Sequence, residues 1–284
     1  MKNQNQAYYL FSRVADEILD GIANGKKSVV ISVDLNRTFR LFELTRERIV
    51  FDPVNELDIE DLRRIKKKEN RVFKLQNGSL ETLEYRNDGY YKLVPTEYAP
   101  TIELSGIRMH RSKDFDPFTD SELKVRQVVN KGDRVLDTCG GLGYTAIWAI
   151  RFGARQVVSV EQNKYVIKLR KQNPWSDELN AANIRLVHDD VFQYIKMLEN
   201  GSFDSVIHDP PRFSRAGELY GEKFYGQLLR VMTGKGRLFH YTGNPYSARR
   251  GKSFIENTAK RLKSTGFTKV FIKEDLLGIR AEKE

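Results

Sequence analysis

This sequence of 284 residues has only one cysteine and no long apolar run. Cys139 is its only cysteine, so no intrachain disulfide can form and we predict a reducing compartment. No run approaches the roughly 20 apolar residues that are needed to cross a bilayer, and residues 1–6 lack the apolar core of a signal peptide. We therefore expect a cytoplasmic protein without a membrane segment, and the residues indicate no metal site.

Positive charge is in excess, with 48 Lys and Arg residues against 38 Asp and Glu residues and a formal net charge of +10. Residues 120–284 hold 28 basic and 19 acidic residues, whereas residues 1–119 hold 20 and 19. A solvated basic surface with no partner is one interpretation. The clustering of the charge in one part of the chain favours the other, an anionic partner, with nucleic acid as the first candidate.

A glycine-rich turn stands at the centre of this basic part. A short apolar strand over 133–136 ends on Asp137, and a helix opens near residue 145, after Gly141 and Gly143. Strand, glycine turn and helix together present free backbone N–H groups and a positive helix end to a nucleotide-like ligand. The pattern is Asp-x-Cys-x-Gly-x-Gly, which resembles the first motif of class I S-adenosylmethionine-dependent methyltransferases.

Acidic residues also follow the next two predicted strands. The strand over 156–160 ends on Glu161, 20 residues after Gly141, and an acid at this place can accept two hydrogen bonds from a ribose diol. The strand over 184–187 is followed by Asp189 and Asp190. The resemblance implies that Asp190 binds the adenine amino group, but either aspartate could instead cap the helix that begins at residue 191.

The fourth strand, over 203–208, runs into Asp209-Pro210-Pro211-Arg212-Phe213. Two prolines cannot continue a sheet ladder, so we expect a rigid loop that exposes fixed acceptors and an aromatic stacking face. The loop resembles the Asp/Asn-Pro-Pro-aromatic motif of methyltransferases that act on nitrogen in planar groups. It departs from that motif because Arg212 precedes the aromatic residue, a variant associated with RNA base methyltransferases. The resemblance implies that Asp209, Pro210, Pro211 and Phe213 are catalytic.

The remaining pattern is helix (218–232), strand (236–241), helix (253–264), strand (267–273) and a short last strand. This order predicts an α/β fold over residues 120–284, with the seven-stranded Rossmann-like sheet of class I methyltransferases and an antiparallel last strand. Residues 1–119 are predicted to form a small α+β N-terminal domain and a connecting segment. The whole chain also resembles an uncharacterised archaeal group of predicted methyltransferases.

The resemblance implies a methyltransferase that uses S-adenosyl-L-methionine and acts on a nucleobase nitrogen in RNA, with tRNA as the first candidate. A cysteine-dependent route to carbon-5 of a pyrimidine is closed, because no cysteine lies in or after the Asp-Pro-Pro loop. The residues predicted to surround the cofactor are Asp137, Cys139, Gly141, Gly143, Glu161 and Asp190. Those predicted to bind the substrate are Arg212, Arg215, Arg249, Arg250 and Lys252, the last three in a loop.

Two other functions stay open. Residues 218–230 resemble a helix of aminopropyltransferases of the spermidine-synthase type, although those enzymes need an acidic pocket for a cationic polyamine. A non-catalytic nucleic-acid-binding protein on a Rossmann scaffold is the second alternative, and cofactor binding would separate it from an enzyme. The sequence leaves open the nucleotide and atom methylated, RNA against DNA or protein as substrate, the role of residues 1–119 and the oligomeric state.

Overall fold

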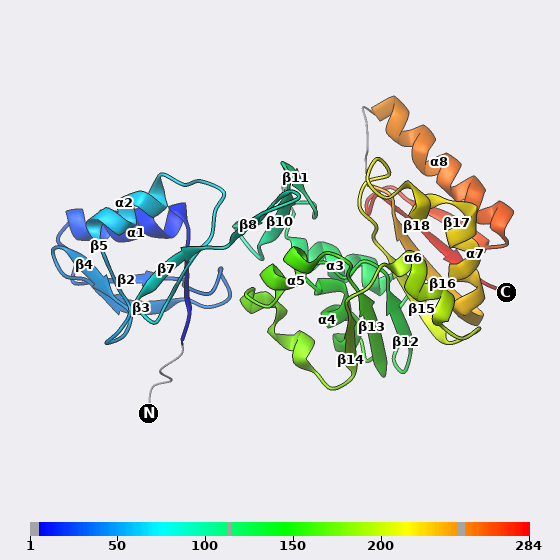
Figure 1. The fold of residues 1–284 in the computed structure, drawn as a ribbon, viewed down its shortest axis with the longest axis horizontal. Coiled ribbons are helices and arrows are strands. Elements are labelled where there is room, and N and C mark those ends of the chain that lie inside the picture. The colour runs from blue at the N-terminus through cyan, green and yellow to red at the C-terminus, as the bar shows by residue number, and fades with distance from the viewer. Residues whose placement is uncertain (1–5, 113–114, 244–247) are drawn as a thin grey trace. The chain divides into compact units, whose positions relative to one another are not determined.

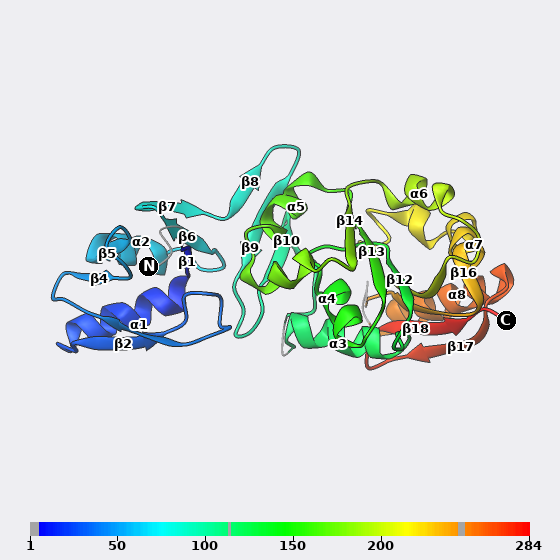
Figure 2. The same cartoon turned by 90° about the horizontal axis from the view of Figure 1, so that it is seen from below.

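The computed structural model describes residues 6–112, 115–243 and 248–284, except for the side chains of 248–253. The chain divides into two compact units. The first consists of Met1–Pro117 with Lys171–Trp175, and the second of Phe118–Arg170 with Ser176–Glu284. Figures 1 and 2 show the elements of each unit in two views. No described helix is long and apolar enough to span a membrane.

The first unit has α+β structure with short strands. Two helices, α1 (Ser12–Ala23) and α2 (Ile59–Lys66), pack against each other. Asp58 caps α2, because its side chain accepts a hydrogen bond from Asp61 N at 2.8 Å. The strands are β1 (Tyr8–Leu10), β2 (Ser28–Ile31), β3 (Arg40–Glu43), β4 (Arg48–Val50), β5 (Glu56–Asp58), β6 (Phe73–Gln76), β7 (Ser79–Thr82), β8 (Glu84–Arg86), β9 (Tyr90–Val94), β10 (Thr101–Leu104) and β11 (Ile107–Arg108).

The second unit alternates strands and helices, as the sequence pattern predicts. Its strands are β12 (Arg134–Asp137), β13 (Gln156–Val160), β14 (Ile184–Val187), β15 (Phe203–His208), β16 (Met232–Tyr241), β17 (Thr268–Lys273) and β18 (Gly278–Glu282). Its helices are α3 (Pro117–Arg126), α4 (Tyr144–Arg151), α5 (Lys164–Arg170), α6 (Val191–Tyr194), α7 (Glu222–Val231) and α8 (Ala248–Thr265), with short 3₁₀ turns η1 (Pro174–Asn180), η2 (Ile195–Met197) and η3 (Gly217–Tyr220).

The seven strands of this unit form one sheet in the order β14-β13-β12-β15-β16-β18-β17, which Figure 1 shows from green through yellow to red. Strands β12 to β16 run parallel, whereas β18 is antiparallel to both of its neighbours. The predicted fold class is therefore confirmed. In register, Asp137 lies beside Ser159 on β13 and Ile207 on β15. The carboxyl ends of these three strands meet at one edge, where ligands of open α/β sheets bind.

Two helix predictions differ from the structure. The helix predicted over 218–232 is divided into η3 and α7, since Gly221 has extended backbone angles, and Met232 already belongs to β16. The helix predicted to start at residue 253 starts at Ala248, so Arg249, Arg250 and Lys252 lie on α8 and not in a loop.

Candidate active site

The glycine loop after β12 has a backbone that only glycine adopts easily. Gly141 and Gly143 have φ of 52° and 86°, in the left-handed region. A Cβ on Gly143 would lie 2.3 Å from Leu179 Cδ1, and one on Gly140 would lie 2.3 Å from Ser159 Oγ. Gly140 N also donates a hydrogen bond to Val160 O at 2.8 Å. The loop is therefore held tightly against the end of β13, where no larger residue fits.

Asp137 lies beneath this loop and is fully buried. Its Oδ2 accepts hydrogen bonds from Thr145 Oγ1 at 3.0 Å and from Ser159 Oγ at 2.7 Å. Its Oδ1 is buried and has no hydrogen-bond partner in the described part of the chain. Burial raises the pKa of Asp137 to about 6, although the two hydroxyl groups oppose that shift. A buried acceptor without a donor costs free energy, which a ligand N–H group would recover.

Glu161 connects the end of β13 to the glycine loop. Its Oε2 accepts from Gly141 N at 3.0 Å, and its Oε1 accepts from Asn163 N at 2.7 Å. The side chain is buried, and this burial raises the pKa of its carboxyl group. Each carboxylate oxygen has two lone pairs, so both oxygens keep the capacity to accept a hydrogen bond from a ligand.

Arg170, at the end of α5, is only 4% exposed, and its Nη1 has no hydrogen-bond partner among the described residues. Burial lowers the pKa of its guanidinium, and the charges of Glu161 and Asp137 oppose this shift. Two buried acids therefore share one buried cation below the loop. Buried charge is costly unless it is compensated, so this part of the site suits a cationic ligand.

Asp190 and Cys139 have local structural roles in this structure. Asp190 is the N-cap of α6, because its Oδ1 accepts a hydrogen bond from Phe192 N at 2.9 Å. Cys139 packs against the hydrophobic core, and burial raises the pKa of its thiol well above the usual value. A thiol that stays protonated is a poor nucleophile.

Asp209 follows β15 and forms an ion pair with Lys124 of α3. Lys124 Nζ lies 2.8 Å from Asp209 Oδ2 and 2.8 Å from an oxygen of Asp120, one turn earlier on the helix. Burial raises the pKa of the Asp209 carboxyl group, and the Lys124 ammonium opposes that shift. The sequence pattern did not indicate Lys124, because an Asp-x-x-x-Lys pair on a helix normally lies on the surface.

The rest of the Asp-Pro-Pro loop is fixed by aromatic residues. Pro211 O accepts a hydrogen bond from Tyr220 Oη at 3.0 Å. The Phe213 ring packs edge-on against the rings of Tyr220 and Phe254, at centroid distances of 5.6 and 5.7 Å. Phe213 still has 45% of its surface exposed. Pro210 is buried, so this loop presents a fixed backbone and an accessible aromatic face.

Two buried histidines support the ends of β15 and β16. His208 Nε2 lies 3.0 Å from Leu219 O, and its Nδ1 lies 2.8 Å from Thr138 Oγ1. His240 Nε2 lies 2.9 Å from Tyr225 Oη, and its Nδ1 lies 3.3 Å from His208 O. Because a carbonyl oxygen can only accept, His208 Nε2 and His240 Nδ1 carry the hydrogens. Burial lowers the pKa of both rings, that of His208 to about 3.

The basic residues predicted to bind substrate are only partly placed. Arg212 and Arg215 are exposed in the loop that follows Pro211. The side chains of Arg249, Arg250 and Lys252 lie outside the described residues. Substrate binding by these five residues therefore stays a prediction.

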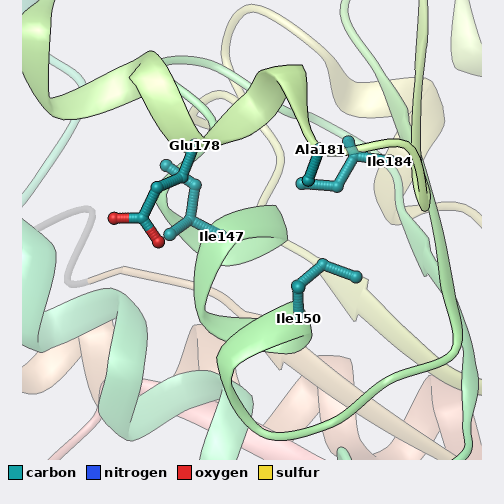
Figure 3. A pocket seen from close by; sticks show the side chains of 5 residues that line it. All are labelled: Ile147, Ile150, Glu178, Ala181 and Ile184. Carbon is teal, nitrogen blue, oxygen red and sulfur yellow. The ribbon is translucent and has the colours of Figure 1, made fainter.

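A hollow of about 310 Å³ lies beside α4, away from the carboxyl edge of the sheet. Figure 3 shows its lining side chains, which are Ile147, Ile150, Glu178, Ala181 and Ile184. Ile184 is the first residue of β14, so the hollow lies toward the amino end of that strand. The Glu178 carboxylate pairs with Arg151.

Among the described residues, no group of three or more His, Cys, Asp or Glu side chains could hold a metal ion.

Known proteins are similar to this chain over different lengths. Residues 120–223 match the family described as Conserved hypothetical protein 95. Uncharacterized protein MJ1233 of Methanocaldococcus jannaschii is 42% identical over 284 residues, which cover 97% of this chain and 95% of the relative. Ribosomal RNA large subunit methyltransferase I of Serratia proteamaculans is 34% identical over 159 residues, which cover 53% of this chain and 40% of that protein. The chain therefore spans less than half of this second relative.

Two solved structures have a similar fold. A spermidine synthase in complex with the transition-state analogue AdoDATO has a TM-score of 0.60 at 14% identity, and the match covers 100% of this chain and 82% of that chain. MNMC2 from Aquifex aeolicus has a TM-score of 0.50 at 17% identity and covers 70% and 72%. At such low identities the likeness shows the fold alone. The 42% identity over 97% of this chain shows that it belongs to one family with MJ1233, and its motifs and seven-stranded sheet follow the pattern of the class I S-adenosylmethionine-dependent methyltransferase fold.

Proposed function

We propose that this protein transfers the methyl group of S-adenosylmethionine to a nitrogen of a nucleobase in RNA, with tRNA as the first candidate. The observation that carries the proposal is the position of Asp209. It lies two residues beyond Ile207, which is in register with Asp137 on the neighbouring strand. A hydrogen-bond acceptor therefore stands at the same sheet edge as the glycine loop, and an exposed aromatic ring, Phe213, follows it.

The residues at the glycine loop fit the cofactor. When bound, S-adenosylmethionine supplies an electrophilic methyl group on a positively charged sulfonium. Gly141 and Gly143 allow the backbone to approach its methionine portion, and Asp137 Oδ1 is a buried acceptor for its amino group. Glu161 would accept the ribose hydroxyl groups, and Asp190 Oδ2, which has no hydrogen-bond donor among the described residues, would accept the adenine amino group. Cys139 would line the cofactor site without taking part in the chemistry.

The residues of the Asp-Pro-Pro loop would orient the base. Asp209 Oδ1 and the Pro210 carbonyl accept hydrogen bonds from a planar amino group, while Pro211 keeps the loop rigid and the base stacks on Phe213. This arrangement aims the nitrogen lone pair at the methyl group, and positioning of this kind supplies most of the rate. Arg212 and Arg215, which are exposed beside the loop, contact phosphates. Arg249, Arg250 and Lys252 of α8, whose side chains lie outside the described residues, are proposed to bind the same substrate.

Transfer to nitrogen is favoured over transfer to carbon-5 of a pyrimidine. The carbon route needs a thiolate that adds to the ring. Cys139 is the only cysteine of the chain, and its thiol has a raised pKa because it is buried. A nitrogen lone pair needs no covalent intermediate, so the residues at the site suffice. The similarity to an enzyme named for ribosomal RNA supports an RNA substrate.

The aminopropyltransferase alternative shares the fold, as the match to spermidine synthase shows. Such an enzyme binds a cationic polyamine and needs free acidic groups. Here the Lys124 ammonium already occupies Asp209 Oδ2 at 2.8 Å, so that oxygen is not available to a polyamine ammonium. The non-catalytic alternative does not account for the buried Asp137 Oδ1, which has no partner among the described residues. The first observation argues against a polyamine at Asp209, and the second supports a bound ligand at the glycine loop.

The test is methylation of total tRNA and ribosomal RNA with labelled cofactor, followed by nucleoside mass spectrometry. We expect an N-methylated nucleoside from tRNA, and binding that weakens with salt by about one unit of log–log slope per phosphate contacted. The Asp209→Ala variant is the matched negative control. A 5-methylpyrimidine product, or labelling of a protein or small metabolite with no labelling of RNA, would overturn the proposal.

A further inference from the structure

We infer that Lys124 is a positioning residue that holds Asp209 as a charged acceptor with one free oxygen, and that Asp120 anchors Lys124 in this role. That the hydrogen-bond donor to Asp209 is a nucleobase rests on the proposed function. Lys124 and Asp120 do not belong to the motifs that follow β12, β13 or β15. Lys124 lies on α3, before the first strand of the sheet, and is 85 residues from Asp209 in the sequence.

The Lys124 ammonium is held from three sides. Asp209 and Asp120 each lie 2.8 Å away, and the Tyr241 ring centroid lies 3.9 Å away. The side chain of Lys124 is 2% exposed and that of Asp120 is 1% exposed, whereas that of Asp209 is 21% exposed. An ammonium has three donors and no acceptor. Its contacts with two carboxylates and a ring face therefore leave it little freedom to turn away from Asp209.

This contact limits what Asp209 can do. Its Oδ2 is taken by Lys124, and no hydrogen bond to its Oδ1 is found among the described residues. The carboxylate can therefore accept from a substrate through Oδ1, in a fixed direction. Without Lys124, the carboxyl group would keep the burial and lose its counter-charge, and it would bind a proton more readily. A protonated Asp209 would offer a donor where the site needs an acceptor.

Stability alone does not explain the pair. Buried ion pairs are often no more stabilising than apolar side chains of the same volume, and a methionine at position 124 would fill similar space. The pair is also at the carboxyl edge of the sheet, where the Asp209 side chain keeps 21% of its surface exposed. A role in setting the charge and direction of Asp209 accounts for both features.

The experiment measures the Asp209 carboxyl group and methyl transfer in parallel. Carboxyl-labelled aspartate and NMR give the protonation midpoint of Asp209 without any substrate, with Asp209→Asn to assign the signal. The charged and titratable groups around it are Lys124, Asp120, Asp137, Cys139, Tyr220 and Tyr241. In Lys124→Met we expect the midpoint to rise by about one pH unit or more, and the acidic limb of the activity profile to move by the same amount.

In the same variant kcat should fall by roughly tenfold or more at neutral pH, with cofactor affinity unchanged. Lys124→Arg should restore part of kcat, and Lys235→Met, at an exposed lysine of β16, should behave as wild type. If Lys124→Met does not fold, Asp120→Asn is measured instead, and a several-fold fall in kcat at constant KM is expected.

An unchanged midpoint and an unchanged pH profile would overturn the inference. If wild type methylates no RNA, the proposed function fails, and the NMR midpoint still decides the role of Lys124.

Discussion

The two sides of the carboxyl edge are built in different ways. On the cofactor side, Asp137 and Glu161 bond to groups that are between 2 and 22 residues away in the sequence. On the acceptor side, Asp209 bonds to Lys124, 85 residues away. The cofactor side therefore depends on a short stretch of chain, and the acceptor side on the packing of α3 against the sheet. Substitutions on the cofactor side should therefore weaken cofactor binding, and substitutions on the acceptor side should lower turnover.

The largest effect is expected for Asp209→Ala. This substitution removes the acceptor for the substrate and leaves the glycine loop untouched, so turnover should fall by about a thousandfold or more. Cofactor affinity, measured by calorimetry, should stay within about twofold of wild type. Single-turnover methylation gives the rate. A variant with full activity would break the division between the two sides, because the acceptor side would then not carry the chemistry.

Glu161→Ala should have the opposite signature. It removes the acceptor for the ribose and the partner of Gly141 N, so cofactor affinity should weaken by several-fold to about a hundredfold. The rate at saturating cofactor should change much less. Glu178→Ala, at an exposed carboxylate beside the hollow of Figure 3, is the matched control. Unchanged affinity in calorimetry would remove Glu161 from the cofactor site.

The buried histidines connect the two sides and should make stability depend on pH. The pKa of His208 is lowered to about 3 by burial, and that of His240 is also far below its usual value of 6.5. Between these values the two rings bind more protons in the unfolded chain than in the folded one, so their contribution to the free energy of unfolding falls as pH drops below about 6.5. The slope should approach about 1.4 kcal/mol per pH unit for each histidine.

Urea unfolding at several pH values measures this slope. His208→Gln and His240→Gln should each reduce it, whereas His188→Gln, at an exposed histidine after β14, should not. The raised pKa of Asp137 gives a slope of opposite sign in this range, so the difference between wild type and each variant is what measures a histidine. Equal slopes in wild type and in both glutamine variants would show that the two rings accept protons without unfolding.

The smallest effect is expected for Cys139→Ser. The residue is partly buried, and desolvation raises the pKa of its thiol, so it supplies no nucleophile, and serine is nearly the same size. Methyl transfer should remain within a few-fold of wild type. Loss of turnover with intact cofactor binding would show that the cofactor side takes part in the chemistry. This result would contradict the division of roles between the two sides.

Patterns along the chain predicted one side of this site much better than the other. The acid that ends β13, Glu161, could be found because a strand end and a distance of 20 residues from Gly141 place it at the loop. Asp209 could be found because two prolines end β15. Lys124 could not be found, since only the packing of α3 makes it buried. The bond from Tyr220 to Pro211 O was missed as well, because Gly221 divides the predicted helix and sets the direction of η3.

The sequence by itself determined the order of strands and helices, the glycine turn and the acids that end each strand. These features depend on periodicity, on the conformations that glycine and proline allow, and on short spacings, which are all properties of neighbouring residues. Only the tertiary structure decided which acids are paired and which acceptors remain unused. Asp137 Oδ1 is left without a described partner, while Asp209 is held by Lys124. Burial and long-range packing set these charges, and neither is encoded in any single stretch of the chain.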